Sequence, residues 1–297
     1  MNLLGSPNNM GIGPICWNPR IWMDTMTYGW SIECDFRPNE TGCLILWGTN
    51  PAESDNSLFW NNIAGYAKEG GNLIVVDPRL SVSARHATVW LHPYPGTDTV
   101  LAYAMARVMI EEDLIDRDFV DEWCSGFDEF KEAAFSRTLE EASAITSCSI
   151  EDIQKASRLF ACNTPSALIS GRGVDQIGPN VAPLHRVLAA LRALVGSVDR
   201  QGGCCINSYP RFMSELELEM SEDLPMVSRE HGLNEDKGLQ SYTGYAKVWP
   251  RLATHGRYLP MRYLTSVLPV RVWEAAVTGE PYRITALFCN AANPMVT

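Results

Sequence analysis

Between residues 43 and 111, short apolar runs alternate with segments whose apolar residues recur at helical spacing. The runs that predict strands are Cys43–Trp47, Leu73–Val76 and Ala87–Leu91, and the segments that predict helices are Leu58–Lys68 and Val100–Glu111. Strands of about five residues that alternate with helices are typical of βαβ units. The pattern therefore predicts an α/β fold built on a parallel sheet.

The same alternation continues after residue 111. Further helices are expected over Asp116–Cys124, Glu129–Phe135, Ser149–Cys162 and Ala182–Val195. The third of these begins with "SIED", which resembles a capping box in which Asp152 is the third helical residue. The run Ala167–Ser170 predicts another strand, and the turn Gly171-Arg172-Gly173 follows it. Strand, glycine turn and helix thus repeat the earlier unit.

The two ends of the chain and one long segment do not follow this pattern. Residues 1–40 are rich in Gly, Pro, Asn, Trp and Tyr without a sustained period, which predicts irregular structure packed on another part. Residues 208–262 are polar and weakly periodic, which predicts a long surface excursion. The last apolar run, Ile284–Cys289, predicts a strand that enters "NAANP", but no helix follows it. A βα unit cut at its turn predicts that the chain is a piece of a larger protein.

Composition places the chain among folded globular proteins and narrows its partners. Its 297 residues are 46% hydrophobic, which is enough for real cores, and its formal net charge of -11 is spread along the chain. This charge argues against nucleic acid as a partner. An anionic small molecule would need a local site made of backbone amides and a few arginines.

The cysteines and the N-terminus predict a reducing, cytoplasmic environment for this chain. Nine cysteines show no C-x-x-C pair, no zinc spacing and no regular framework, which favours buried free thiols and no metal site. For the vicinal Cys204-Cys205, a strained disulfide or a soft-metal site stays open beside that interpretation. "MNLLGSPNNMGIG" has neither a basic region nor a long apolar run, so no signal peptide or membrane anchor is expected there.

The turns after the predicted strands carry the candidate chemistry. Gly48 would let the backbone approach a ligand, and the amides at the next helix start could receive a phosphate, although Asn-Pro also forms plain turns. Asp77 stands where nucleotide-binding folds hold a ribose, or is an ordinary turn residue. Arg79 balances Asp77 or meets a phosphate, and Asp98 lies near a helix N-cap or faces the adjacent donors of a guanine.

Together these turns predict more than each does alone. They occur in order on successive units of one sheet, at the carboxyl edge where ligands bind in open α/β sheets. The chain lacks the G-x-G-x-x-G pattern of common dinucleotide sites. The sequence therefore predicts a nucleotide site that is not built for a common dinucleotide.

Several segments resemble the molybdopterin oxidoreductase family, of the dimethyl sulfoxide reductase type that carries a bis(molybdopterin guanine dinucleotide) cofactor. The segments are "LGSPNNMGIGPICWNPR", "ILWGTNPAES", "VVDPRLSVSARHATVWLHPYPGTD", "GRGVDQIGPNVAPLHRVLAALRALVGSVDRQGG" and "ALFCNAANP". The resemblance covers nearly the whole chain. It implies a three-layer α/β/α architecture in which a Rossmann-like domain, residues 43–160, is inserted in a second α/β domain formed by residues 1–42 and 161–297.

The resemblance also implies a set of cofactor-binding residues. They are Gly48, Thr49, Asn50, Pro51, Glu53, Ser54, Asp77, Pro78, Arg79, Gly96, Thr97, Asp98, Gly171, Arg172, Gly173 and Asn293. The first twelve would bind one guanosine diphosphate moiety, with Asp98 on the guanine edge. The Gly171 turn would lie nearer the pterin, and Asn293 would begin the second nucleotide site. Catalytic residues are not assigned within this chain.

The family pattern extends beyond this chain. Family members usually carry a [4Fe-4S] centre in an N-terminal region and an upstream ligand to molybdenum or tungsten, and a C-terminal domain closes over both dinucleotides. The resemblance implies these missing domains as partners, together with a small-molecule substrate and an iron-sulfur electron-transfer subunit. The full-length enzyme would be periplasmic or membrane-associated, whereas this chain by itself is expected to be cytoplasmic. Cys16 lies downstream of the family's metal ligand, so it is assigned to packing or to the site periphery.

Three functions compete on these observations. The leading one is the cofactor-binding central portion of a molybdenum or tungsten oxidoreductase, inactive alone, whose complete form carries out oxygen-atom or electron transfer. The second is a pterin-free structural subunit of a respiratory complex, against which the joint presence of Asp77, Asp98 and the Asn-containing turns argues. The third, a generic Rossmann dehydrogenase, conflicts with the missing glycine fingerprint.

Overall fold

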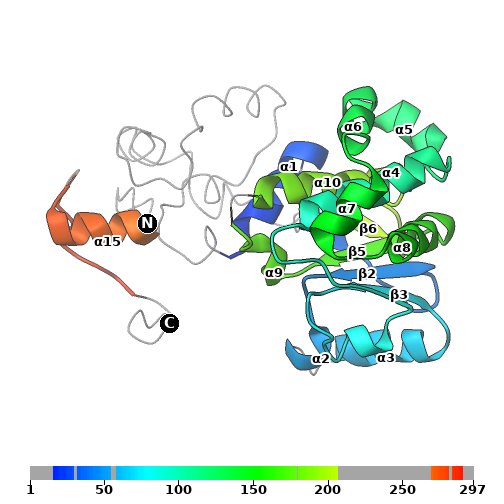
Figure 1. Ribbon diagram of the computed structural model, residues 1–297. Helices are drawn as coiled ribbons and strands as arrows, with labels where there is room; N and C mark the ends of the chain where they lie inside the picture. The colour runs from blue at the N-terminus through cyan, green and yellow to red at the C-terminus, as the bar shows by residue number, and fades with distance from the viewer. Residues whose placement is uncertain are drawn as a thin grey trace, which may run out of the picture. The chain divides into compact units, whose positions relative to one another are not determined.

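Residues 16–29, 32–54, 58–178, 180–206, 269–280 and 283–289 are described by the computed structural model of the chain (Figure 1). The chain divides into two units. The first, which we call the α/β unit, spans Cys16–Ser208, and the second combines Met1–Ile15 with Tyr209–Thr297. Each unit is described by itself.

A four-stranded parallel sheet forms the centre of the α/β unit, with strand order β4-β3-β2-β5. The strands are β2 (Cys43–Trp47), β3 (Asn72–Val76), β4 (Val89–Leu91) and β5 (Ser166–Ser170). Every residue of β2 is buried, as expected of an apolar strand with neighbours on both edges and helices on both faces. The predicted α/β fold with a parallel sheet is confirmed.

Side chains alternate between the two faces of the sheet, and each face packs against helices (Figure 1). On one face, Leu44 and Leu46 join a core with residues of α3 (Leu58–Lys68) and of the short 3₁₀ helix η3 (Ala84–His86). The helices on the opposite face are α4 (Asp98–Glu111), α8 (Ile150–Cys162) and α10 (Val181–Leu194). Their buried side chains form the larger core with Ile45 and other strand residues. The unit therefore has three layers.

Short helices cover the outside of α4, and side-chain caps fix where they begin. They are α5 (Arg117–Trp123), α6 (Phe127–Ala134) and α7 (Leu139–Thr146). The carboxylate of Asp116 accepts the N–H of Phe119 at the start of α5. Ser149 likewise accepts the N–H of Asp152 in α8, which confirms the predicted cap. The sequence interpretation missed α7, although Thr138 and Glu141 form a complete capping box there.

The prediction of irregular structure for residues 1–40 is wrong for part of that range. Helix α1 (Asn18–Tyr28) has a proline in its first turn and ends at Gly29, whose φ of 84° places it in the left-handed region. α1 packs against α10, and the Tyr28 hydroxyl donates to the carbonyl of Ala189 at 2.6 Å. Strand β1 (Ile32–Cys34) then pairs antiparallel with β6 (Cys204–Ile206). Tertiary packing, rather than a clear helical period, determines this segment.

The sheet crosses the domain boundary predicted after residue 160. β5 lies beyond that boundary, yet it pairs with β2 residue for residue, from Cys43 with Ser166 to Trp47 with Ser170. The apolar run of β5 supplies the second neighbour that the buried β2 requires. The assignment of an inserted and a split domain stays a prediction.

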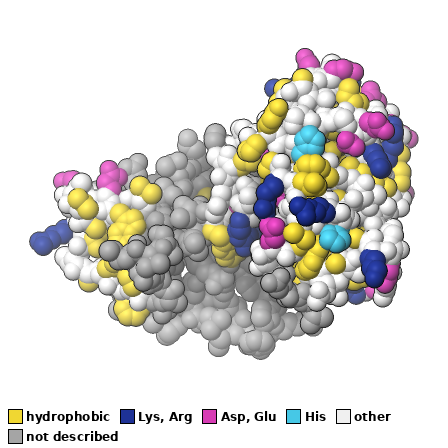
Figure 2. All heavy atoms as spheres, turned by 60° about the horizontal axis from the view of Figure 1, so that its bottom comes forward, with side chains coloured by type: hydrophobic (Ala, Val, Ile, Leu, Met, Phe, Trp, Pro, Cys, Tyr) yellow, Lys and Arg dark blue, Asp and Glu magenta, His cyan; other side chains and the backbone are white. Residues whose placement is uncertain are grey.

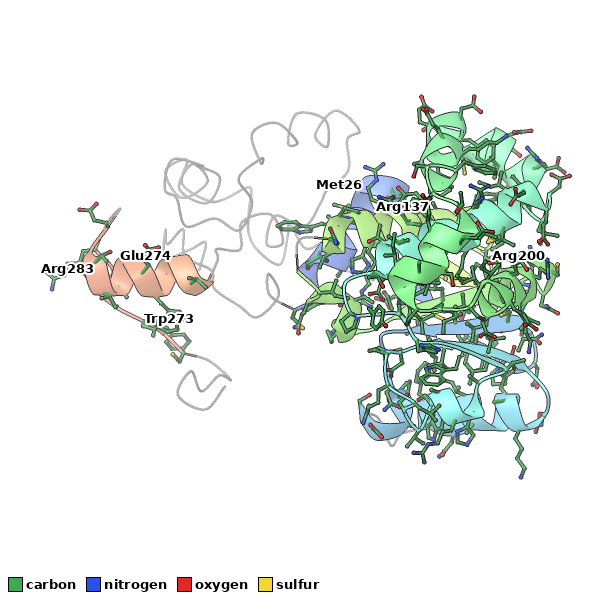
Figure 3. The ribbon with its side chains drawn as sticks, in the orientation of Figure 1. Met26, Arg137, Arg200, Trp273, Glu274 and Arg283 are labelled. Atoms are coloured by element: carbon green, nitrogen blue, oxygen red, sulfur yellow. The ribbon has the colours of Figure 1, made fainter. Side chains whose placement is uncertain are left out.

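In the second unit the structure describes helix α15 (Pro269–Thr278) and residues 283–289. Figure 3 marks Trp273 and Glu274 on this helix and Arg283 beyond it. The strand predicted over Ile284–Cys289 is wrong, since these residues form no strand and Phe288 is 84% exposed. The excursion predicted for residues 208–262 lies outside the described residues. Within the described part of the chain, no helix is long and apolar enough to cross a membrane.

Candidate functional site

The order of the strands reverses at one place in the sheet. From β2 the chain adds β3 and then β4 on one side, and later adds β5 on the other side of β2. In open α/β sheets such a switch point leaves a crevice at the carboxyl ends of the strands, where ligands bind. The loops that leave β2 and β5 at this edge begin with Gly48 and Gly171, both predicted site residues.

The two loops approach so closely that side chains would not fit between them. A Cβ on Gly171 would lie 2.2 Å from the carbonyl oxygen of Gly48, and one on Gly173 would lie 3.0 Å from it. Gly48 itself has a φ of +60°, which favours glycine. The Gly171 N–H donates to the Trp47 carbonyl at 2.8 Å, so sheet pairing continues into the loop before the single turn α9 (Arg172–Asp175). The structure thus brings together predicted site residues more than 120 positions apart in sequence.

The loops after β2 and β3 are joined by a polar network. The Asn50 amide oxygen accepts the Ser83 hydroxyl at 2.7 Å, and its amide nitrogen donates to the Glu53 carboxylate at 2.7 Å. The same carboxylate pairs with Arg79, and this hydrogen bond raises the pKa of the Arg79 guanidinium. Asn50 and Glu53 belong to the turn that opens α2 (Pro51–Ser54). Arg79 therefore balances Glu53 rather than Asp77, and its side chain stays 66% exposed.

Asp77 stands at the end of β3, where the sequence places it. One of its carboxylate oxygens accepts the Arg79 N–H at 2.9 Å, a local turn that Asp commonly makes. Its carbonyl oxygen accepts the Trp90 indole N–H at 2.8 Å. Asp77 is half-buried and the following Pro78 is exposed. The carboxylate thus lies at the edge of the sheet, in a turn fixed by its neighbours.

Asp98 is the first residue of α4 and is buried, with 6% of its surface exposed. Its carboxylate accepts the Trp47 indole N–H at 2.9 Å, which links the end of β2 to the start of α4. Burial raises the pKa of the Asp98 carboxyl, and the bond from Trp47 opposes that rise. Thr97 bonds back to the Tyr94 carbonyl at 2.7 Å, next to Gly96 with its positive φ. The Asp98 carboxylate is therefore held by the protein; its role toward guanine stays a prediction.

Ionisable residues also lie behind the β5 turn, and the sequence interpretation gave most of them no role. Asp175 lies 3.3 Å from Arg172 and 2.9 Å from His185, and the Asp175 and His185 side chains are buried. Arg192 of α10 lies 3.6 Å from Asp24 of α1, with both side chains almost fully buried. The pairing of Asp24 with Arg192 could not be predicted from the sequence, because only the packing of α1 on α10 brings these distant residues together.

Figure 2 shows Lys and Arg side chains among acidic and hydrophobic ones on one face of the molecule. Two arginines belong to the edge described above. Arg20 of α1 donates to the carbonyl of Ser170, the last residue of β5, and Arg172 has a 54% exposed side chain in the next turn. Arg20 was missed because nothing in the sequence of α1 relates it to β5. Asn293 lies outside the described residues.

Asp24 makes the folding stability of the α/β unit depend on pH. Both carboxylate oxygens are buried without a hydrogen bond, and desolvation raises the pKa to about 6 against the attraction of Arg192. Because the folded state keeps this proton where the unfolded chain loses it, the stability contribution is present at low pH and is lost as pH rises from about 4 through 6. A pKa shift of this size corresponds to ~3 kcal/mol of unfolding free energy.

We expect the difference in unfolding free energy between the unchanged chain and Asp24→Asn to fall by ~3 kcal/mol from pH 4 to pH 7. Urea unfolding followed by circular dichroism at each pH measures it. Taking the difference cancels the other carboxylates, such as Asp35 and Glu112, whose pKa values are lowered and whose effect has the opposite sign. Parallel profiles for the two proteins would show that Asp24 is ionised and solvated.

Comparison with known proteins agrees with this geometry. Residues 9–240 match the family model described as molybdopterin oxidoreductase. The chain is 29% identical to acetylene hydratase of Syntrophotalea acetylenica over all of its own length and 40% of that protein. It is 32% identical to formate dehydrogenase H of Escherichia coli, over 73% of the chain and 32% of that protein.

A solved structure is also similar to this chain. Acetylene hydratase from Pelobacter acetylenicus superposes with a TM-score of 0.80 at 27% identity, covering 95% of this chain and 39% of that one. The chain thus spans at most 40% of these relatives. Since the family model covers most of its residues, the resemblance seen in the sequence is confirmed, and the chain belongs to the molybdopterin oxidoreductase family.

Proposed function

We propose that this chain binds the guanosine diphosphate part of a molybdopterin guanine dinucleotide, as the central portion of a longer molybdenum or tungsten enzyme. The observation that carries the proposal is the switch point between β2 and β5, where Gly48, Gly171 and Gly173 let the two loops pack backbone to backbone at the carboxyl edge of the sheet. Glycine-containing loops at this edge can present backbone groups to a ligand. These features, with the polar residues around them, support a nucleotide at this edge.

The contacts already made inside the protein refine which residues would hold the nucleotide. The N–H groups of Gly48 and Gly171 are used by the sheet, so we assign the diphosphate to Thr49 and Asn50 beyond it. The exposed Arg172 and Arg79 guanidiniums supply positive charge that an acidic chain otherwise lacks. Asp77 would accept the ribose hydroxyls from the end of β3.

Within this proposal Asp98 acts on the guanine side of the site. Its bond to Trp47 fixes the carboxylate between β2 and α4, where it would face the base. When bound, the cofactor would supply oxygen-atom or electron transfer at molybdenum or tungsten. The proposed enzyme also needs its missing N- and C-terminal domains, a [4Fe-4S] centre and a small-molecule substrate, none of which the chain's own residues define.

One observation favours the alternative, a pterin-free structural subunit. The Glu53–Arg79 pair and the Trp47–Asp98 bond satisfy polar residues of the proposed site within the protein itself. A scaffold would keep such groups for its own stability, so their presence does not by itself require a ligand. A direct binding measurement separates the two functions.

The test is isothermal titration of the chain with GDP, ADP and NAD. We expect GDP to bind more tightly than ADP and NAD, and Asp77→Asn to weaken GDP about 10-fold, since a hydrogen bond to a charged group contributes ~1.5 kcal/mol or more. The matched control is Asp121→Asn, an exposed carboxylate on α5. Heat is preferred to tryptophan fluorescence as the signal. Trp47 is bonded to Asp98, so a substitution at Asp98 would change its fluorescence even without a ligand.

The outcomes distinguish the candidates. Selective GDP binding that Asp121→Asn leaves unchanged and Asp77→Asn weakens supports the nucleotide site. Equal or tighter binding of NAD would contradict it and favour a dehydrogenase. Absence of binding by all three nucleotides, with an intact fold by circular dichroism, would favour the structural subunit.

A further inference from the structure

Two cysteine side chains face each other across the small sheet formed by β1 and β6. Cys34 is the register partner of Cys204 in this antiparallel pair. In the neighbouring pair, the Asp35 N–H donates to the Gly203 carbonyl at 2.9 Å. The Cys204 N–H donates to the Ser197 carbonyl and not to Cys34. Cys34 and Cys204 therefore occupy a non-hydrogen-bonded position, where opposing Cα atoms lie only ~4.5 Å apart and side chains are closest.

The two thiols also contact each other. Cys204 is fully buried and Cys34 is half-buried. The Cys34 thiol beside it lowers the pKa of the Cys204 thiol, and the nearby Arg192 guanidinium lowers it further, against the effect of burial. Cys204 is thus the more acidic thiol of the pair, and Cys34 is the more accessible one.

Cys205, the other neighbour of Cys204, points away. Successive side chains of a strand lie on opposite faces, and Cys205 is paired in register with Glu33. Its sulfur donates to the carbonyl of Arg200 at 3.9 Å, in the turn before β6 where Figure 3 marks Arg200. A vicinal bond between Cys204 and Cys205, left open by the sequence, would require this strand to be rebuilt.

We infer that Cys34 and Cys204 form a reversible cross-strand disulfide when the chain meets a hydroperoxide. A thiolate of the pair attacks one peroxide oxygen, the O–O bond breaks with release of hydroxide, and that cysteine becomes a sulfenic acid. The other sulfur then attacks the sulfenic sulfur, the S–S bond forms and the S–O bond breaks. Two thiols and one hydrogen peroxide thus give one disulfide and two waters, and a dithiol reductant reverses the step.

The position of the pair gives the bond a structural effect. β1 leads into the parallel sheet, and β6 follows α10, the last helix of the α/β unit. A Cys34–Cys204 bond would therefore join the segments by which the chain enters and leaves the sheet and helices. Closing so long a loop restricts the unfolded chain strongly.

The experiment treats the reduced chain with stoichiometric hydrogen peroxide at low protein concentration, alkylates the remaining thiols and maps peptides without reduction. We expect a peptide that joins Cys34 to Cys204, faster migration on a non-reducing gel, and a Tm raised by roughly 5–15 °C. Dithiothreitol should reverse all three changes. Because the map uses the unchanged sequence, it does not depend on any variant that fails to fold.

Matched variants locate the bond. Cys205→Ser should keep the linked peptide and the Tm rise, whereas Cys34→Ser and Cys204→Ser should each abolish both. The inference is overturned if Cys34 and Cys204 remain alkylated after oxidation, if Cys204 is linked to Cys205, or if oxidation stops at sulfinic acid. The exposed Cys162 and Cys289 report on non-specific oxidation in the same map.

Discussion

Gly171→Ala should destabilise the α/β unit by about 3 kcal/mol and abolish GDP binding. The added Cβ would lie 2.2 Å from the Gly48 carbonyl oxygen and 2.5 Å from Cβ of Thr49, so backbone atoms rather than a flexible side chain must move. The sheet bonds on both loops resist that movement. Urea unfolding followed by circular dichroism measures the stability, and isothermal titration measures the binding.

The same substitution at Gly65 is the matched control. Gly65 lies inside α3 and has no heavy atom within 4 Å of the position that a Cβ would take. Alanine is favoured over glycine in a helix, so Gly65→Ala should raise the unfolding free energy by ~0.5–1 kcal/mol. If Gly171→Ala behaved like Gly65→Ala, the two loops could not approach as closely as described.

Arg192→Met should cost ~3–5 kcal/mol, because it leaves the Asp24 carboxylate buried without its positive partner. Removing both charges, as Asp24→Leu with Arg192→Met, should recover most of that loss, since apolar side chains of similar size fill the same space. Thermal and urea unfolding of the two single variants and the double variant complete the cycle.

An exposed pair provides the comparison for this effect. Arg117 and Asp113 lie 2.7 Å apart, but their side chains are 53% and 72% exposed. Arg117→Met should therefore change the stability by no more than ~0.5 kcal/mol. A similar cost for the variants at positions 117 and 192 would indicate that Arg192 is solvated.

The central sheet could be predicted because its determinants are local. The apolar runs of β2, β3 and β5 are long enough to be recognised, and each ends at a glycine or Asp-Pro turn. The opposite holds for β1 and β6, whose three-residue strands exist only because they pair with each other. The run 284–289 shows the converse, because its apolar residues alone did not determine a strand.

For the candidate site, the sequence predicted where the residues lie in the fold better than it predicted which side chains they contact. Gly48, Asp77 and Gly171 do lie at one edge, because parallel strands place their carboxyl ends together. The interactions of Asp98 with Trp47 and of Arg79 with Glu53 connect residues from different loops. Only the packed fold determines them, just as only the packing of α1 on α10 reveals Asp24 and Arg192.

The strand order also has a consequence for synthesis on the ribosome. β2 emerges early and is soon flanked by β3, but its other edge waits for β5, which follows ~120 residues later and is made roughly 6–24 s afterwards. During that interval a wholly apolar strand presents unpaired N–H and C=O groups, the kind of edge that recruits other nascent chains. Co-translational chaperone binding should therefore concentrate on ribosomes that have passed β4 and have not yet released β5.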